Sequence, residues 1–329
     1  MTGDVVSLKS VLDVAESELQ RGRSAAPRTW ATGFDPLDTY LGGGLRAGEL
    51  ILLGGPQGLG KTTFALQVLR QVAFEGGRAL LFSFEHDEQT LLERMISLEA
   101  AERSGGEGVP LRLVRQAMQH ELGEGDLGHR LSGSEGAGEA LSAVTAYGDR
   151  FYLHRSSGRS TTIDVIRDRV LASVAAGDRP VVVVDYLQKV AAPGVDEQER
   201  VTHIVEGLKD LALEVELPVL AVVAADREGL IAGRRLRVHN LRGSSALAYE
   251  ADVVLLLNEK YDVVARHHLV YDTSSAERFR GYVVLSIEKN RSGLDKVDLE
   301  FRKRFEQGRF ERHGKAVTEQ LVDERIFVE

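Results

Sequence analysis

The chain has 329 residues, of which 43% are hydrophobic and 28% charged, which is typical of a soluble globular protein in one large or two small domains. It has no cysteine and no apolar run near the roughly 20 residues that span a bilayer, so disulfides, cysteine-ligated zinc and membrane insertion are excluded, and we expect a cytoplasmic location. The formal net charge of −9 argues against a surface coated in positive potential, although not against a local basic channel.

The first predicted element is an amphipathic helix over residues 7–20, for which Ser7 is a candidate N-cap. An isolated helix of about 14 residues is marginal in water, so its apolar stripe needs a surface to cover. Two surfaces are possible: the helix packs on its own domain, or it reaches a neighbouring subunit. The stripe consists of Leu8, Val11, Leu12, Ala15 and Leu19.

The most informative segment joins a short apolar strand at residues 50–53 to a helix that begins near residue 61. Between them, residues 55–62 match Gly-x-x-x-x-Gly-Lys-Ser/Thr in full, in the strand–loop–helix context that this motif requires. Glycines let successive backbone N–H groups surround an anion, and the helix N-terminus adds its positive dipole. Lys61 can reach the β- and γ-phosphates, and the Thr62 hydroxyl is placed to ligate Mg²⁺. The segment therefore predicts a nucleoside triphosphate site, whose residues are Gly55, Pro56, Gln57, Gly58, Leu59, Gly60, Lys61, Thr62 and Thr63.

Two carboxylates follow later apolar strands at the point where each strand ends. Glu85 stands after the strand at residues 79–84, and Asp185 ends a run of four valines. Ligands of open α/β sheets bind outside the carboxyl ends of the strands. Hydrolysis of a triphosphate needs a metal ligand and a group that orients the attacking water. Either carboxylate alone could merely cap a strand, but together they make Asp185 the candidate that holds Mg²⁺ through water and Glu85 the candidate general base.

The rest of the chain alternates strands and helices. Further buried strands are expected at residues 219–223, 253–257 and 282–287, which favours one doubly wound α/β core. Residues 102–140 are rich in glycine among polar residues and are predicted to be a flexible insertion. The arginines at positions 234, 235 and 237 are interpreted as part of a solvated loop.

Six segments together resemble the C-terminal ATPase domain of DnaB-type replicative helicases, which has a RecA-like fold. Asp-Tyr-Leu-Gln after an apolar strand is more discriminating than the phosphate loop alone, and the similarity extends over roughly residues 5–312. The six segments, in family order, are residues 32–38, 60–65, 82–85, 184–188, 241–244 and 288–293.

The resemblance implies a short N-terminal linker helix and linker at residues 1–25, a RecA-like P-loop domain at residues 26–312 with a largely parallel sheet flanked by helices, and a charged tail at residues 313–329. It implies a homo-oligomer, usually a hexameric ring, that binds ATP and Mg²⁺ between subunits. Residues 7–20 would then match the linker helix that docks on the adjacent protomer, which favours the second of the two surfaces considered for it.

The resemblance also implies roles for individual residues. Glu85 would activate the attacking water and Asp185 would order the metal. Lys289 and Arg291 would reach the γ-phosphate held by the neighbouring subunit. The loop that grips single-stranded DNA in the central channel would contain Arg242, Gly243 and Ser244.

Two departures from the family pattern modify this expectation. The family carries a separate N-terminal domain for primase and loader contacts, whereas barely 25 residues precede this core. The strand at residues 219–223 also lacks the usual Ser-Gln ending, because Val223-Ala224 stands there and alanine cannot hydrogen-bond a phosphate. We therefore expect an accessory or repurposed relative that hydrolyses ATP on single-stranded DNA and has a replication or repair protein as partner. The alternative is an ATP-gated scaffold that recruits a protein without unwinding DNA.

Overall fold

A computed structural model describes residues 5–26, 28–119, 125–194, 196–270 and 273–324. A small antiparallel ribbon, β1 (Thr29–Trp30) with β2 (Leu45–Arg46), and helix α2 (Asp35–Tyr40) precede the main sheet. The strands of the main sheet are β3 (Leu50–Gly55), β4 (Arg78–Ser83), β5 (Phe151–Arg155), β6 (Pro180–Asp185), β7 (Val219–Ala224), β8 (Val253–Glu259), β9 (Tyr282–Asn290), β10 (Val297–Arg304), β11 (Arg309–Phe310) and β12 (Lys315–Ala316).

The main sheet has the strand order β11-β10-β9-β8-β3-β7-β6-β4-β5, with β12 paired to β10. The six strands from β8 to β5 are parallel, and β9 to β12 extend this sheet with antiparallel pairs. Every residue of β3 and β6 is buried, as expected for central strands covered on both faces. The predicted α/β architecture is confirmed, and the antiparallel extension adds an edge that the sequence pattern did not reveal.

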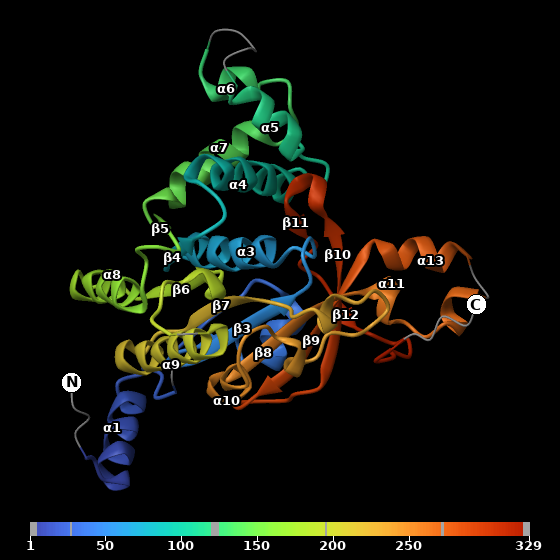
Figure 1. Cartoon of the computed structure of the whole chain (residues 1–329). Coiled ribbons are helices and arrows are strands. Elements are labelled where there is room, and N and C mark those ends of the chain that lie inside the picture. Colours follow the sequence, from blue (N-terminus) through green and yellow to red (C-terminus); the bar gives the residue numbers. More distant parts are fainter. Residues whose placement is uncertain (1–4, 27, 120–124, 195, 271–272, 325–329) are drawn as a thin grey trace.

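Helices cover both faces of the sheet (Figure 1). Helix α3 (Lys61–Phe74) lies along one face, while α8 (Ile163–Ala175) and α9 (Glu197–Val215) lie along the other. The Thr162 side chain accepts a hydrogen bond from the backbone N–H of Val165 and so caps α8. Smaller helices follow in the second half of the chain: α10 (Ala246–Glu250), α11 (Lys260–Val263), α12 (His267–Val270) and α13 (Thr273–Arg280). None of the helices in the described part of the chain is long and apolar enough to cross a bilayer.

The glycine-rich segment at residues 102–140 is more regular than expected. After α4 (Glu88–Arg103) it forms α5 (Leu111–Ala117), α6 (Leu127–Arg130) and the start of α7 (Ala137–Gly148), and residues 120–124 lie outside the described part. A separate apolar core joins these helices, which project above the sheet in Figure 1. The described residues of this predicted flexible insertion therefore form helices with an apolar core of their own. Gly108 and Gly136 permit close packing on α4, since a Cβ atom would lie 2.2 Å and 2.4 Å from backbone atoms of Ala100.

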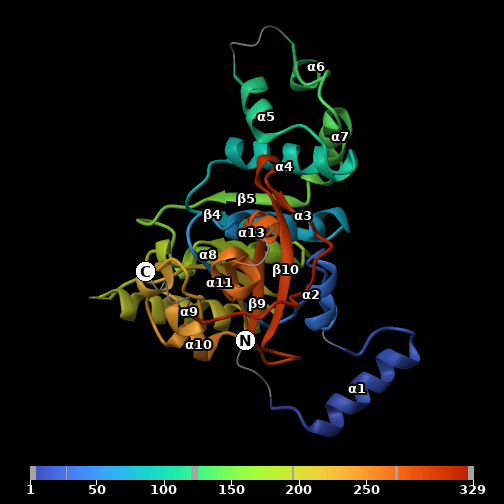
Figure 2. The same cartoon turned by 90° about the vertical axis from the view of Figure 1, so that its right-hand side faces the viewer.

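Helix α1 (Leu8–Gln20) stands away from the sheet in both views (Figures 1 and 2). Its predicted cap is confirmed, because the Ser7 hydroxyl accepts a hydrogen bond of 3.1 Å from the backbone N–H of Ser10. No residue of α1 is buried, and the side chains of Leu8, Val11 and Leu12 are at least half exposed. The helix therefore does not pack on its own domain in this chain, which leaves its apolar stripe available to a second surface.

The tail at residues 313–324 follows the antiparallel edge of the sheet. Strand β12 pairs with β10, and the backbone N–H of Val322 donates to the carbonyl of Val263. Buried Lys260 forms ion pairs with Glu300 on β10 and Glu319 in the tail. The last predicted tail residues, 325–329, lie outside the described part.

A buried ion pair between α3 and α4 gives the first testable prediction. The Arg70 guanidinium donates two hydrogen bonds of 2.5 and 2.7 Å to Glu99, whose side chain is fully buried. Removing one partner of a buried pair leaves an uncompensated charge and typically costs about 3–5 kcal/mol. We expect Glu99→Ala to lower the free energy of unfolding in urea by this amount, whereas Glu88→Ala, at an exposed position of the same helix, changes it by less than about 1 kcal/mol. Equal effects of the two variants would contradict the prediction.

Candidate active site

The predicted phosphate loop connects the end of β3 to the first residue of α3. Gly58 and Gly60 adopt left-handed backbone conformations, with φ of 78° and 84°, which glycine takes without steric cost. Gly60 is also needed for space, because a Cβ atom there would lie 2.7 Å from the Phe310 ring and 2.9 Å from the Phe305 ring. The loop is therefore a compact cradle of backbone N–H groups at a helix N-terminus, which is a favourable site for phosphate.

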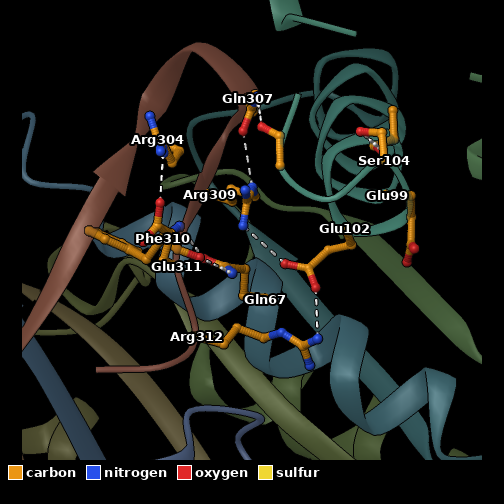
Figure 3. A network of polar contacts seen from close by, with 12 residues as sticks. Gln67, Glu99, Glu102, Ser104, Arg304, Gln307, Arg309, Phe310, Glu311 and Arg312 are labelled. Carbon is orange, nitrogen blue, oxygen red and sulfur yellow. Dashed lines mark hydrogen bonds and ion pairs between the residues drawn. The ribbon is translucent and has the colours of Figure 1, made fainter. Parts of the chain in front are cut away.

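A network of polar contacts attaches the hairpin formed by β10 and β11 to this loop's helix (Figure 3). The Gln67 side chain on α3 donates to the carbonyl of Phe310 and accepts from its N–H, at 2.9 and 2.7 Å. Glu102 on α4 forms ion pairs with Arg309 and Arg312, at 3.3 and 2.7 Å. These contacts fix the two phenylalanine rings beside Gly60.

Lys61 is the first residue of α3 and folds back over the loop. Its Nζ donates hydrogen bonds of 2.7 Å to the Gly55 carbonyl and 2.9 Å to the Pro56 carbonyl. Burial lowers the pKa of the Lys61 ammonium, while the nearby carboxylates of Asp185 and Glu85 act in the opposite direction. The side chain is thus positioned at the phosphate cradle, together with the two strand-end carboxylates that the sequence singled out.

The two predicted metal ligands meet directly. The Thr62 hydroxyl donates a hydrogen bond of 2.6 Å to Oδ2 of Asp185. Burial, with a contribution from the charge of Glu85, raises the pKa of Asp185 to about 6, and the hydrogen bond from Thr62 opposes this shift. A hydroxyl and a carboxylate beside a phosphate cradle form the oxygen donor set that Mg²⁺ prefers, so the residues present fit this ion.

Glu85 joins this group through the pairing of β4 with β6. Ser83 is in register with Asp185, and the N–H of Phe84 donates to the Asp185 carbonyl at 2.9 Å, so Glu85 lies just beyond the same sheet edge. Glu85 is exposed and lines one cavity of about 560 Å³ together with Lys61, Thr62 and Asp185. An accessible carboxylate next to a phosphate cradle and a metal-type site can accept a proton from water.

The cavity is also lined by residues that no sequence motif indicated, among them His86, Arg94, Leu111 and Phe305. The sequence does contain a pattern that could have indicated Arg94, because this charged residue interrupts the buried face of α4 between Leu91 and Met95. Phe305 had no such pattern, since it is 244 residues from Lys61 in sequence (305 − 61) and reaches the cavity only through the hairpin fold.

The loop predicted to bind DNA lies beside the cavity. Arg242 lines the cavity and forms an ion pair of 2.8 Å with Glu197 on α9. Gly243 packs on α9, where a Cβ atom would lie 2.5 Å from Val201, and the Ser244 hydroxyl is 2.7 Å from that of Thr202.

Gln188, which ends the Asp-Tyr-Leu-Gln segment, connects this loop to the end of β7. Its amide donates to the Arg242 carbonyl at 2.9 Å, and its carbonyl oxygen accepts from the N–H of Ala224 at 3.1 Å. The end of β7, the Gln188 side chain and the loop at residues 241–244 therefore form one connected unit at the cavity.

Comparison with known proteins decides the family. Residues 30–311 match the model of the DnaB-like helicase C terminal domain. The chain belongs to this family.

Similar proteins agree with the assignment. Replicative DNA helicase DnaB of Pasteurella multocida (strain Pm70) is 27% identical over 285 residues, which are 84% of this chain and 54% of that protein. The DnaB of Treponema pallidum (strain Nichols) is 27% identical over 286 residues, again 84% and 54%. The chain thus spans about half the length of these curated relatives. The solved structure of a DnaB-like replicative helicase superimposes with a TM-score of 0.72 at 19% identity, covering 92% of this chain and 68% of that one, and shares its fold.

In this DnaB-like domain, Lys289 and Arg291 lie far from the cavity of their own chain. Arg291 donates to Oδ1 of Asp252 at 3.2 Å, and Oδ2 of Asp252 accepts from the N–H of Leu50, the first residue of β3. The phosphate loop follows the other end of β3, five residues on, and a strand rises about 3.3 Å per residue, so roughly 16 Å of strand separates the two edges. Lys289 donates to the Ala248 carbonyl in the middle of α10.

The arginines at positions 234, 235 and 237 are engaged rather than solvated. Arg235 is buried and pairs with Asp298 on β10, and Arg237 pairs with Glu288 on β9. Arg234 and Arg237 also contact carboxylates near the end of the described tail, at Glu324 and Asp323. The interpretation of a solvated loop was wrong, because acidic residues distant in sequence meet these arginines only in the folded chain.

Proposed function

We propose that this DnaB-like domain binds ATP with Mg²⁺ at the interface between protomers of a hexameric ring, hydrolyses it, and acts on single-stranded DNA. The observation that carries the proposal is the separation of the candidate residues. Lys61, Thr62, Asp185 and Glu85 surround one cavity, while Arg291 lies at the opposite edge of the sheet. A cation at that edge can complete only the site of another protomer.

The residues at the cavity suit hydrolysis of a phosphoanhydride. Lys61 would contact the β- and γ-phosphates, and Thr62 and Asp185 would hold Mg²⁺. When bound, this ion neutralises charge on the phosphate oxygens. Glu85 would accept a proton from the attacking water, since its carboxylate is exposed to the cavity. Lys289 and Arg291 from the next protomer would stabilise the charge that develops on the γ-phosphate.

Two features support a ring and a nucleic-acid partner. The apolar stripe of α1 is exposed along its length, which suits docking on an adjacent protomer. The loop of Arg242, Gly243 and Ser244 is connected to the nucleotide cavity through Gln188, which suits coupling between the cavity and DNA phosphates. A replication protein would be the further partner, since a similar solved structure is described as a DnaB-like replicative helicase and its interactions with primase.

ATP turnover tests the enzymatic part of the proposal. We expect the wild-type chain to hydrolyse ATP when Mg²⁺ is present, with a rate that changes on addition of a single-stranded oligonucleotide. Lys61→Ala should lower the rate by at least about 100-fold, because it removes a cation aimed at the transferred phosphate. A wild-type chain that shows no turnover, with and without the oligonucleotide, would overturn it.

DNA binding is tested separately by fluorescence anisotropy with a labelled oligonucleotide. Contacts to phosphates release counterions, so affinity should fall steeply as salt rises. Arg242→Ala should weaken binding on different sequences to a similar degree, because backbone contacts carry no sequence information. If the oligonucleotide did not bind, or bound with an affinity independent of salt, the proposed action on DNA would be wrong while the proposed ATP hydrolysis would be unaffected.

A second candidate function, an ATP-gated scaffold for a protein partner, is favoured by Ala224. Its methyl group lines the cavity at the end of β7 and offers no hydrogen bond to a phosphate. Mass photometry with ATP, with ADP and without nucleotide distinguishes the two candidates. ATP-dependent assembly without turnover or DNA affinity supports the scaffold.

A further inference from the structure

Three lysine or arginine side chains from the described residues line the nucleotide cavity: Lys61, Arg94 and Arg242. Two of them have partners in the chain, since Lys61 donates to loop carbonyls and Arg242 pairs with Glu197. Arg94 differs, because its Nε atom is buried and has no hydrogen-bond partner in the described part of the chain. A buried donor without a partner is costly, so an acceptor supplied by a ligand would be bound strongly there.

The surroundings of Arg94 leave its charge available to the cavity. The adjacent carboxylate, Glu93, is engaged by Arg115 of α5 at 3.0 Å. Burial, together with the charge of Arg115, lowers the pKa of Arg94, and Asp185 acts in the opposite direction. The guanidinium stays protonated, because arginine is the most basic side chain and keeps its charge in proteins. Arg94 is thus a partly buried cation that lines the cavity, and the carboxylate next to it in sequence is already paired.

The position of Arg94 indicates which phosphate it would meet. Helix α4 begins three residues after Glu85, and Arg94 lines the same cavity as Asp185, whose charge favours the protonated guanidinium. Thr62 and Asp185 would hold Mg²⁺, which would bring the outer phosphates of a bound triphosphate to this side of the cavity. Arg94 would therefore be near the outer phosphates, because it lines the same cavity as Thr62, Asp185 and the candidate general base.

The neighbouring end of β7 offers no competing side-chain donor. Ala224 has only a methyl group, and its backbone N–H already donates to Gln188. An outer phosphate in this cavity would consequently find no side-chain donor at the end of β7, while the guanidinium of Arg94 has an unused one.

We propose that Arg94 binds the terminal phosphate of ATP within its own protomer and makes the site discriminate triphosphate from diphosphate. This inference rests on the proposed ATP site and adds to it the group that senses the third phosphate. It does not depend on ring formation, because all of its parts belong to one chain.

Competition binding with a fluorescent nucleotide tests the proposal, using ADP and the β,γ-imido analogue of ATP with Mg²⁺. Loss of a charge-assisted hydrogen bond should weaken binding of the triphosphate analogue in Arg94→Gln by about 10- to 100-fold. ADP binding should change less than about threefold, since ADP lacks the phosphate concerned. The matched control is Arg103→Gln on the same helix, which does not line this cavity and should leave both affinities unchanged.

Equal losses for ADP and the triphosphate analogue, or no loss, would overturn the role of Arg94. The proposed function fails in a different way, because then the wild-type chain would bind neither nucleotide. Arg94→Lys serves if the glutamine variant does not fold: it keeps the charge with a shorter reach, and should lose affinity for the analogue while retaining that for ADP. If Arg94→Gln did not fold and Arg94→Lys still discriminated the triphosphate analogue from ADP as the wild type does, the role of Arg94 would be structural.

Discussion

Arg291→Ala should lower the maximal rate of ATP hydrolysis by about 1,000-fold or more and leave nucleotide binding nearly intact. A cation supplied by a neighbouring subunit acts mainly on charge that develops in the transition state, and such arginines contribute about 10³–10⁵ in rate. The fold should tolerate the change, since the Arg291 side chain is about half exposed and its partner Asp252 keeps an ion pair of 2.7 Å with Lys209. Steady-state turnover and binding of the β,γ-imido analogue are the measurements.

Mixing two inactive variants makes this test specific for action between protomers. Lys61→Ala lacks the lysine of the phosphate loop, and Arg291→Ala lacks the cation that would reach the neighbouring site. An interface is therefore complete only where an Arg291→Ala protomer binds ATP and the adjacent Lys61→Ala protomer supplies Arg291. Random mixing in equal amounts gives about one such interface in four, so about a quarter of the wild-type rate should return. Arg302→Ala, at an exposed position of β10, is the control and should keep full activity. A mixture as inactive as its components, or equal loss of binding and turnover in Arg291→Ala, would show that Arg291 acts otherwise.

Asp185→Asn should abolish Mg²⁺-dependent turnover and at the same time stabilise the nucleotide-free protein at pH 8. The carboxylate titrates with a pKa of about 6 in the folded chain but has an ordinary pKa of 3.8, so the folded state binds its proton more tightly than the unfolded state does. Ionisation of Asp185 therefore destabilises the fold: the cost is absent below about pH 4, grows as pH rises, and is complete above about pH 6. A shift of about two units corresponds to about 3 kcal/mol.

Urea unfolding at pH 5 and pH 8, without nucleotide or Mg²⁺, measures this effect. The asparagine variant should gain about 1–3 kcal/mol at pH 8 and less at pH 5, where much of Asp185 is already protonated. Its amide can still accept from Thr62, so the local geometry should persist. Asp168→Asn, at an exposed position of α8, is the control and should show no such pH-dependent gain. If the asparagine variant were instead less stable than the wild type at pH 8, the ionised Asp185 carboxylate would stabilise the fold, and the prediction would be wrong.

Much of the fold could be predicted because its signals are local. Strands β3, β6 and β7 each appear in the sequence as one nearly uninterrupted apolar run, because strands buried on both faces contain almost only hydrophobic residues. The phosphate loop was likewise predictable, because the glycines and Lys61 lie within a few residues of one another. The helices of segment 102–140 were not predicted, because composition does not distinguish a glycine used for close packing, as Gly108 and Gly136 are on α4, from one used for flexibility.

The sequence by itself determined a glycine-rich loop of the phosphate-binding type, two strand-end carboxylates and an α/β core, because each depends on residues that are adjacent in the chain. Only the tertiary structure decided which side chains share the cavity and which do not. Arg94 and Phe305 reach the cavity from α4 and a distant hairpin, whereas Arg291 lies at the opposite edge of the sheet. The physical reason is that the direction and order of strands fix which ends meet, and strand order in a sheet is set by packing between elements far apart in sequence.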